Sequence, residues 1–356
     1  MRNSDRVREI AERFCSGARL SFEDGRDLYL HANLLELSQM AHWMRARLHP
    51  EPAVTYIVSR NINYTNVCWV RCSFCAFYRP PGSEEGYVLT KEVIFQKIRE
   101  MVDAGGIEIL IQGGLNPKLR IEYYEDLFSS VKKNFKVHIH GLSAAEILYI
   151  AHLSRMTVKD TIARLRASGL DTIPGAGGEI LVDEVRKQIA PLKDTTEEWL
   201  GVMRDAHSLG MRTTATMMYG SVDRAEHRLE HLMRVRELQD ETGGFTAFIP
   251  WNYQPGGTEL GGKKTTGFEY LKMLALSRIL LDNVANIQAS WVTQGAQIAQ
   301  LALQYGANDF GSTMFEEHVV KAAGATFCMN EEELKRQVRN AGYEPRRRNT
   351  YYQYVN

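Results

Sequence analysis

The chain has 356 residues, of which 44% are hydrophobic and 24% charged, so its composition is that of a globular protein with one large domain or two small ones. Its 43 basic and 43 acidic residues balance, which removes the electrostatic case for binding nucleic acid or an anionic membrane surface. No segment approaches the roughly 18 uninterrupted apolar residues of a membrane span, and the charged N-terminus has no apolar core that would predict a signal peptide.

Helices are predicted before about residue 50, because apolar residues recur at helical spacing between Glu23 and Arg45. Beyond Pro52, short β-branched or apolar runs alternate with longer amphipathic stretches, a pattern typical of repeated β-α units and a parallel sheet. The candidate strands are Val54–Ile62, Ile107–Gln112, Val137–Gly141, Thr172–Ile173, Arg212–Tyr219, Phe245–Pro250, Ile287–Ser290 and Asn308–Phe310. The helical patterns are Lys91–Ala104, Tyr123–Asn134, Val158–Ala167, Thr196–Leu209, Ala225–Thr242, Phe268–Leu281, Gln294–Tyr305 and Asn330–Ala341.

Eight strand–helix units predict an α/β protein with a closed (β/α)8 TIM-like barrel, and a partial barrel of about six units is the alternative because the fourth and eighth strands are weak. We expect a helical extension over residues 1–52, the barrel over 53–328, and a C-terminal helix with a polar tail over 329–356. The arginine run Arg346–Arg348 is expected to lie in a solvated tail or to contact a small anion.

Three cysteines are clustered directly after the first predicted strand. Cys68, Cys72 and Cys75 have C-x3-C-x2-C spacing and are followed by an aromatic residue. A structural zinc site normally has four ligands, and no C-x2-C partner or H-x3-5-H pair occurs elsewhere. An odd total of five cysteines argues against a disulfide framework, and Cys15 and Cys328 are expected to be isolated packed or semi-exposed residues. Three thiolates therefore predict a [4Fe–4S] cluster with one iron left open. Its oxygen sensitivity, together with the missing export signal, predicts a cytoplasmic protein.

Other candidate residues follow the strands at the end where a barrel forms its active face. Gly113 and Gly114 would let backbone groups approach a ligand, with a plain tight turn as the alternative. His138 and His140 alternate on one strand and point the same way. On the outer face they would pack under helices, and the adjacent Ser143 favours the pocket.

Glu179 follows a glycine-rich loop and is expected to take a ribose hydroxyl or a proton, or else to be a charge at a helix N-terminus. Tyr219 should reach the rim of the barrel. The remaining candidates lie in loops where aromatic side chains suit a flat ring, or else pack at the rim. They are Trp251, Gln254, Trp291 and Thr293.

The cysteine motif in the first β-α loop resembles the radical S-adenosylmethionine (radical SAM) superfamily. Finer motifs resemble the group of the futalosine-pathway menaquinone enzymes and the deazaflavin synthase subunits, and most of all the cyclic dehypoxanthinylfutalosine synthase (dehypoxanthine futalosine cyclase) family. The chain departs from that pattern at Ser221–Asp223, where relatives have Gly-His-Val/Ile-Glu. The motifs are Asn61–Cys68, Cys75–Arg79, Ile111–Pro117, Ala215–Gly220, Phe248–Pro255, Ala289–Gly295 and Gly306–Met314.

This resemblance implies that a 5′-deoxyadenosyl radical removes the ribose C4′ hydrogen of dehypoxanthine futalosine, whose carbon radical then adds to its own benzoate ring. It also implies a flavodoxin- or ferredoxin-type electron donor. The alternatives are aminofutalosine synthase, a deazaflavin synthase-type enzyme, an electron-transfer protein and a non-enzymatic barrel. The implied roles are cluster ligation by Cys68, Cys72 and Cys75, S-adenosylmethionine binding by Tyr64, Phe74, Gly113, Gly114 and Ser143, substrate binding by Trp251, Gln254, Trp291 and Thr293, and proton acceptance by His140, Glu179 or Tyr219.

Overall fold

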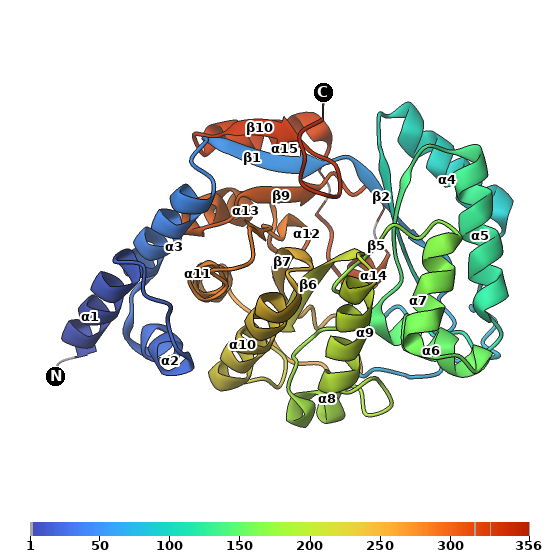
Figure 1. Cartoon of the computed structure of the whole chain (residues 1–356), viewed down its shortest axis with the longest axis horizontal. Helices are drawn as coiled ribbons and strands as arrows, with labels where there is room; N and C mark the ends of the chain where they lie inside the picture. The colour runs from blue at the N-terminus through green and yellow to red at the C-terminus, as the bar shows by residue number, and fades with distance from the viewer. Residues whose placement is uncertain (1–2, 317, 328, 356) are drawn as a thin grey trace.

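The computed structural model describes residues 3–316, 318–327 and 329–355, and Cys328 lies outside them. Three helices, α1 (Asn3–Cys15), α2 (Phe22–His31) and α3 (Leu34–Leu48), precede the first strand, as predicted. They lie to one side of the molecule in Figure 1, where α3 packs along α11. Ser21 and Asn33 cap α2 and α3 with side-chain hydrogen bonds, so the sequence itself marks where each helix begins.

The eight predicted strands are all present and run parallel. The first is divided into β1 and β2, and β2 to β8 form one seven-stranded sheet in chain order. The strands are β1 (Ala53–Ile57), β2 (Ser59–Asn63), β3 (Glu108–Gln112), β4 (His138–Gly141), β5 (Thr172–Ile173), β6 (Arg212–Tyr219), β7 (Phe245–Asn252), β8 (Asn286–Ile287) and β9 (Asp309–Ser312).

The sheet curls, and β9 spans the seam between its ends. A bridge joins Gln288, just past β8, to Asp309 of β9. On its other side β9 pairs with β1, where Thr55 lies opposite Asp309. The hydrogen-bonded path therefore runs round all eight predicted strands, and the predicted α/β barrel is confirmed.

Helices cover the outside of this sheet (Figure 1). Three helices, α6, α8 and the short α14, were not predicted from the sequence. The expected helix over 294–305 is wrong in detail. Gly295, with φ +82°, separates α12, which ends at Gln294, from α13, which begins at Ala296 and is followed by a short 3-10 turn. The helices are α4 (Lys91–Asp103), α5 (Ile121–Asn134), α6 (Ala144–Ser154), α7 (Val158–Ala167), α8 (Asp183–Ile189), α9 (Thr196–Ser208), α10 (Ala225–Thr242), α11 (Gly267–Leu280), α12 (Trp291–Gln294), α13 (Ala296–Ala302), η1 (Leu303–Tyr305), α14 (Val319–Ala322) and α15 (Glu331–Asn340).

The C-terminal segment is not a solvated tail. After α15, strand β10 (Glu344–Arg347) pairs in parallel with β1. Arg346 is exposed, but Arg348 is only 4% exposed and forms an ion pair with Asp309 inside the barrel (Nη2 to Oδ1, 3.0 Å). The expectation for the arginine run is therefore wrong at Arg348, because its buried carboxylate partner lies on a strand distant in sequence.

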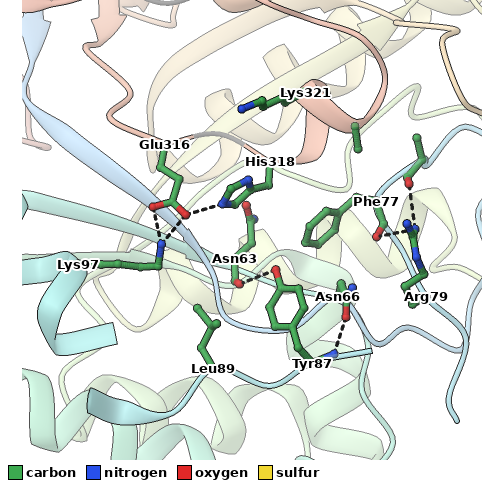
Figure 2. A pocket seen from close by; sticks show the side chains of 12 residues that line it. Asn63, Asn66, Phe77, Arg79, Tyr87, Leu89, Lys97, Glu316, His318 and Lys321 are labelled. Carbon is green, nitrogen blue, oxygen red and sulfur yellow. Dashed lines mark hydrogen bonds and ion pairs between the residues drawn. The ribbon is translucent and has the colours of Figure 1, made fainter. Parts of the chain in front are cut away.

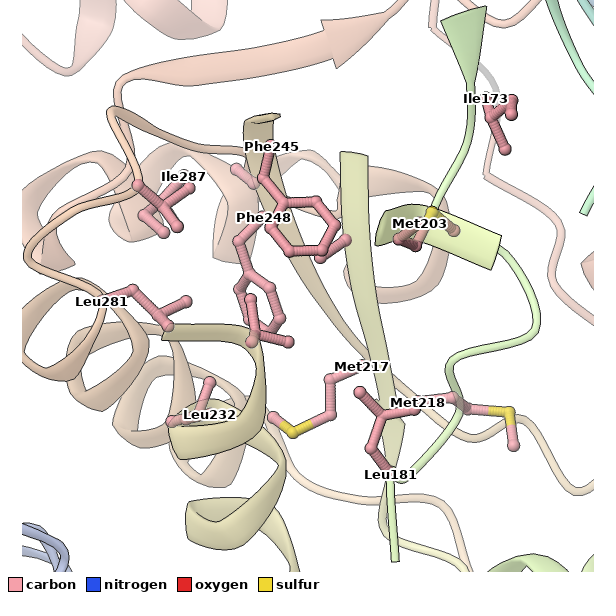
Figure 3. Close-up of a cluster of buried hydrophobic side chains, with 14 of the residues drawn as sticks. Ile173, Leu181, Met203, Met217, Met218, Leu232, Phe245, Phe248, Leu281 and Ile287 are labelled. Carbon is pink, nitrogen blue, oxygen red and sulfur yellow. The ribbon is translucent and has the colours of Figure 1, made fainter. Parts of the chain in front are cut away.

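Apolar side chains of the sheet pack against its helices. Figure 3 shows Phe245 and Phe248 of β7 beside Leu232 of α10, with Met217 on the neighbouring strand. Burying such a side chain contributes about 1.5–3 kcal/mol. In the described part of the chain, no helix is long and apolar enough to cross a membrane.

Candidate active site

The loop after β2 folds back on itself and carries the three cysteines. The backbone N–H of Cys68 donates to Arg79 (2.9 Å), and that of Cys75 donates to Cys72 (3.0 Å). Cys68 and Cys72 are buried and Cys75 is half-buried, and all three line one cavity of about 180 Å³, which we call the cluster cavity. Cys15 is exposed, so no fourth cysteine joins them among the described residues.

The donor set of the cluster cavity fits an iron–sulfur cluster better than a single ion. A mononuclear zinc site holds its thiolates at about 2.3 Å from one ion. Among the described residues no three ligating side chains are gathered in that way. A cluster binds each cysteine through a different iron, so its ligands stand further apart around one cavity. Burial raises the pKa of the Cys72 and Cys75 thiols, so thiolates there require the positive charge of bound iron.

The opposite wall of the cluster cavity is built from the ends of β3 and β4. Gly113, Gly114 and Ser143 line it, as does Phe74 from the cysteine loop. A Cβ on Gly114 would lie 2.4 Å from the carbonyl oxygen of Val67, so only glycine allows β3 to approach the cysteine loop this closely. Four of the five residues predicted beside S-adenosylmethionine therefore meet around one cavity.

Tyr64, the fifth, does not line that cavity. It is fully buried behind Gly113, and its hydroxyl donates to Glu146 (2.8 Å). Glu146 also accepts from the N–H of Gly113 (3.0 Å) and from the N–H (2.7 Å) and hydroxyl (2.8 Å) of Ser143. Burial raises the pKa of Glu146 to about 7, against the opposing effect of these donors. Ser143 and Glu146 form the capping box of α6, so the Ser-x-x-Glu pattern was the sequence signal for this positioning carboxylate.

A second cavity, of about 360 Å³, occupies the inside of the barrel, and we call it the lumen. Phe74, Gln112, Ala176, Gly177 and Val319 line both the lumen and the cluster cavity, so the two share a wall. A molecule bound in the lumen would therefore lie next to the cavity that the cysteines line.

The three predicted proton acceptors have different surroundings. His140 lines the lumen, and its Nδ1 is 2.7 Å from the hydroxyl of Thr172. Burial, with the nearby Arg348, lowers the pKa of His140 to about 3, so the ring is neutral near pH 7. Glu179 also lines the lumen. Tyr219 is fully buried outside the residues that line either cavity, and its hydroxyl has no hydrogen-bond partner among the described residues.

Lys193, in the loop between α8 and α9, was not predicted as a site residue. Its Nζ donates to Glu179 Oε1 (2.8 Å) and lies 5.6 Å from the centre of the Phe74 ring. Arg186 is 3.8 Å from the other oxygen of Glu179. Glu179 is therefore paired with two cationic side chains where the cluster cavity and the lumen meet.

The predicted substrate residues are partly brought together. Trp251, Trp291 and Thr293 line the lumen. The indole N–H of Trp291 donates to the carbonyl of Ser312 (3.0 Å), which fixes its ring. Gln254 does not line the lumen, and its amide is bonded to the carbonyl of Asn252 (3.0 Å). His138 lies lower on β4, where it contacts Tyr351 of the C-terminal segment.

A third cavity, of about 470 Å³, opens beside the cysteine loop (Figure 2). Phe77 and Asn63 line both this cavity and the cluster cavity. Across it, Glu316 pairs with Lys97 (2.6 Å) and contacts His318. This network fixes the segment after β9 against α4, next to the cysteines.

The fold and the site define a parallel α/β barrel with three cysteines gathered around one cavity at the C-terminal ends of its strands, a donor set that suits an iron–sulfur cluster. Residues 62–235 match the model of the radical SAM superfamily, and residues 242–356 match that of the CofH/MqnC C-terminal region. Methylornithine synthase (PylB) has a TM-score of 0.73 at 19% identity, covering 94% of this chain and 97% of that one. The hydrogenase maturase HydG has a TM-score of 0.75 at 14% identity, covering 98% and 77%.

Cyclic dehypoxanthine futalosine synthase of Halalkalibacterium halodurans is 47% identical over 97% of this chain and 94% of its own length. The enzyme of the same name from Streptomyces coelicolor is 44% identical, covering 98% and 89%. A 5-amino-6-(D-ribitylamino)uracil–L-tyrosine 4-hydroxyphenyl transferase of Methanosarcina barkeri is 43% identical, covering 94% and 90%. The chain therefore belongs to the radical SAM superfamily, in the family with a CofH/MqnC C-terminal region. This membership implies a [4Fe–4S] cluster and S-adenosylmethionine, and Cys68, Cys72 and Cys75 fit the C-x3-C-x2-C motif.

Proposed function

We propose that this protein is a radical SAM cyclase that converts dehypoxanthine futalosine to cyclic dehypoxanthinylfutalosine in menaquinone biosynthesis. When bound, the cluster and S-adenosylmethionine supply a 5′-deoxyadenosyl radical that takes the ribose C4′ hydrogen atom of the substrate. The C4′ carbon then bonds to the substrate's own benzoate ring. Loss of one proton, with transfer of one electron to an electron carrier of the flavodoxin or ferredoxin class, restores the aromatic ring. The observation that carries this proposal is the similarity to two synthases of that name over nearly the whole chain.

The geometry supports specific roles for the residues of the cluster cavity. Cys68, Cys72 and Cys75 are the proposed ligands, and Gly113 and Gly114 give the cofactor's amino acid end access to backbone groups. The wall shared by the two cavities keeps the radical next to its target. Such positioning matters because a free primary radical reacts indiscriminately, whereas a held one benefits from a high effective concentration.

In the lumen, Trp251 and Trp291 would contact the aromatic ring of the substrate, with Thr293 beside them. For the proton acceptor we propose His140 or Glu179, because both line the lumen, whereas Tyr219 lines neither cavity. The lowered pKa of His140 makes its ring a weak base, and Glu179 is already paired with two cations. The electron would come from a flavodoxin- or ferredoxin-type protein.

Anaerobic reconstitution with reductant, S-adenosylmethionine and dehypoxanthine futalosine, followed by mass spectrometry, tests the function. A product lighter than the substrate by two hydrogens, formed together with 5′-deoxyadenosine, is expected. 5′-Deoxyadenosine formed only slowly and without regard to substrate would overturn the cyclase proposal. A parallel reaction with 5-amino-6-(D-ribitylamino)uracil and L-tyrosine tests the activity that the name of the Methanosarcina relative describes.

A further inference from the structure

The inner wall of the barrel carries an amide group with no partner. Asn61 lies on β2 and is 5% exposed, and it lines the lumen. Its side-chain oxygen has no hydrogen-bond partner, and its amide nitrogen makes no hydrogen bond to any described residue. A buried polar group left without a partner costs folding free energy. Such a group at a cavity wall therefore points to a ligand or water that satisfies it.

The strand register places Asn61 at the middle of the lumen. Asn61 lies opposite Leu110 of β3, which in turn lies opposite His140 of β4. All three residues line the lumen, so they form one inward-facing layer. Two residues along the strands, Asn63 and Gln112 form the next layer, which reaches the cluster cavity. Asn61 thus lies one layer below the place where the radical is generated.

Two further carboxamides line the lumen. The side chains of Gln112, at the end of β3, and Gln288, just past β8, make no hydrogen bond within the described part of the chain. With Asn61 they give the lumen three amide groups that each combine a donor and an acceptor. Sugar hydroxyls also combine a donor and an acceptor, so this chemistry complements them.

Charge in the lumen does not favour a carboxylate ligand there. Among the described residues lining it, Arg348 is the sole permanent cation, and two of its nitrogens are already bound to Asp309. His140 is neutral, because its pKa is lowered to about 3 by burial. The lumen is therefore suited to the faces of the substrate's aromatic ring and to neutral polar groups bound by hydrogen bonds, with the benzoate carboxylate directed out of it.

We propose that Asn61, assisted by Gln112 and Gln288, binds hydroxyl groups of the substrate's sugar and holds its ring below the cluster cavity. This inference rests on the proposed function. It assigns a positioning role to three residues outside the cysteine loop and the glycine pair. The sugar must be held in one orientation, because only one of its hydrogens is to be removed.

Asn61→Leu tests this role, because leucine matches asparagine in size and removes both the donor and the acceptor. Binding of dehypoxanthine futalosine to the cluster-loaded but unreduced protein is measured by anaerobic calorimetry with S-adenosylmethionine present. A separate titration with S-adenosylmethionine measures the affinity for the cofactor. We expect a loss of roughly 10- to 100-fold in substrate affinity with unchanged S-adenosylmethionine affinity. Gln288→Met should give a smaller loss in the same direction.

Thermal unfolding gives a second readout that a structural role would not produce. Asn61→Leu should unfold at a temperature at least as high as wild type, since it removes an unpartnered buried amide. The matched control is Asn286→Leu in β8, because Asn286 is equally buried but bonds Thr246 and Asn308 (both 2.8 Å). It should lower the unfolding temperature and leave substrate affinity unchanged.

Three results would overturn the inference. The first is unchanged substrate affinity in Asn61→Leu. The second is a loss of S-adenosylmethionine affinity in place of substrate affinity, which would assign the amide to the cofactor's ribose. The third is a lowered unfolding temperature of Asn61→Leu, like that of the control. If the wild-type protein itself binds no dehypoxanthine futalosine, the proposed function fails as well, and the wild-type titration alone shows it.

Discussion

Gly114→Ala is the sharpest test of how the cluster cavity is built. The added Cβ would lie 2.4 Å from the Val67 carbonyl oxygen and 2.8 Å from the Cβ of Cys68, whereas ordinary contact begins near 3.4 Å. The cysteine loop must therefore move by about 1 Å, and the obstacle is backbone, which cannot rotate away. Overpacking of this kind costs about 1–3 kcal/mol. A displacement of about 1 Å at a reacting centre can also lower the rate about 100-fold.

The assay is iron and sulfide content per chain after reconstitution, followed by the rate of 5′-deoxyadenosine formation and the urea midpoint of unfolding. We expect Gly114→Ala to reduce all three. The matched control is Gly201→Ala in α9, where an added Cβ meets nothing within 4 Å. There alanine should stabilise the helix by about 0.5–1 kcal/mol and leave the cluster intact. A Gly114→Ala protein with full cluster content and wild-type 5′-deoxyadenosine formation would refute the reasoning.

Three further outcomes are expected. Tyr219→Phe should leave cyclisation unchanged, because its hydroxyl has no hydrogen-bond partner among the described residues and Tyr219 lines neither cavity. A large loss of rate would return Tyr219 to the proton-acceptor candidates. Arg348→Met should lower the free energy of unfolding in urea by about 3–5 kcal/mol, because it leaves the buried Asp309 without its cation. The control Arg346→Met, at an exposed position, should change the free energy of unfolding by less than about 1 kcal/mol. Equal effects of the two substitutions would contradict this prediction. Burial alone would raise the pKa of Glu316, but hydrogen bonds from neighbouring lysine, arginine and histidine side chains outweigh this effect and lower the pKa to about 2. Because this value is below that of the unfolded chain, the stability it contributes is present above about pH 4.5 and is lost as the pH falls towards 2. Glu316→Gln should therefore flatten the acid limb of stability against pH, and an unchanged limb would contradict the assignment.

Local sequence patterns were sufficient to predict the strands of the barrel. The period of the apolar residues changes from helical to short extended runs near Pro52, and each predicted strand occurs within two residues of its expected start. Helix α6 was missed because it is apolar on several sides, so its sequence has no clear amphipathic period. Strand β10 was missed because Glu344–Arg347 is highly charged and is stabilised only by pairing with β1, which is distant in sequence.

The site residues also fall into two groups, those predicted by a local sequence pattern and those brought together only by the fold. The cysteines and the glycine pair were identifiable because their spacing is local, and both line the cluster cavity. Lys193 and Arg348 were not identifiable, because each acts through a partner brought close only by the barrel: Glu179 for the first and Asp309 for the second. Whether a single lysine or arginine is buried cannot be predicted from its neighbours in the sequence.

The charges inside the barrel suggest why neutral groups do the positioning. Lys193 is bound to Glu179 and Arg348 to Asp309, so each of these two cations already has a carboxylate partner. A radical transfer separates no charge and needs no fixed ion to stabilise it, whereas an unpaired charge in the lumen would carry a large desolvation cost. Amides such as that of Asn61 orient a hydroxyl-bearing substrate without that cost. Residue surveys that look for titratable groups therefore overlook the side chains on which the orientation of this substrate would depend.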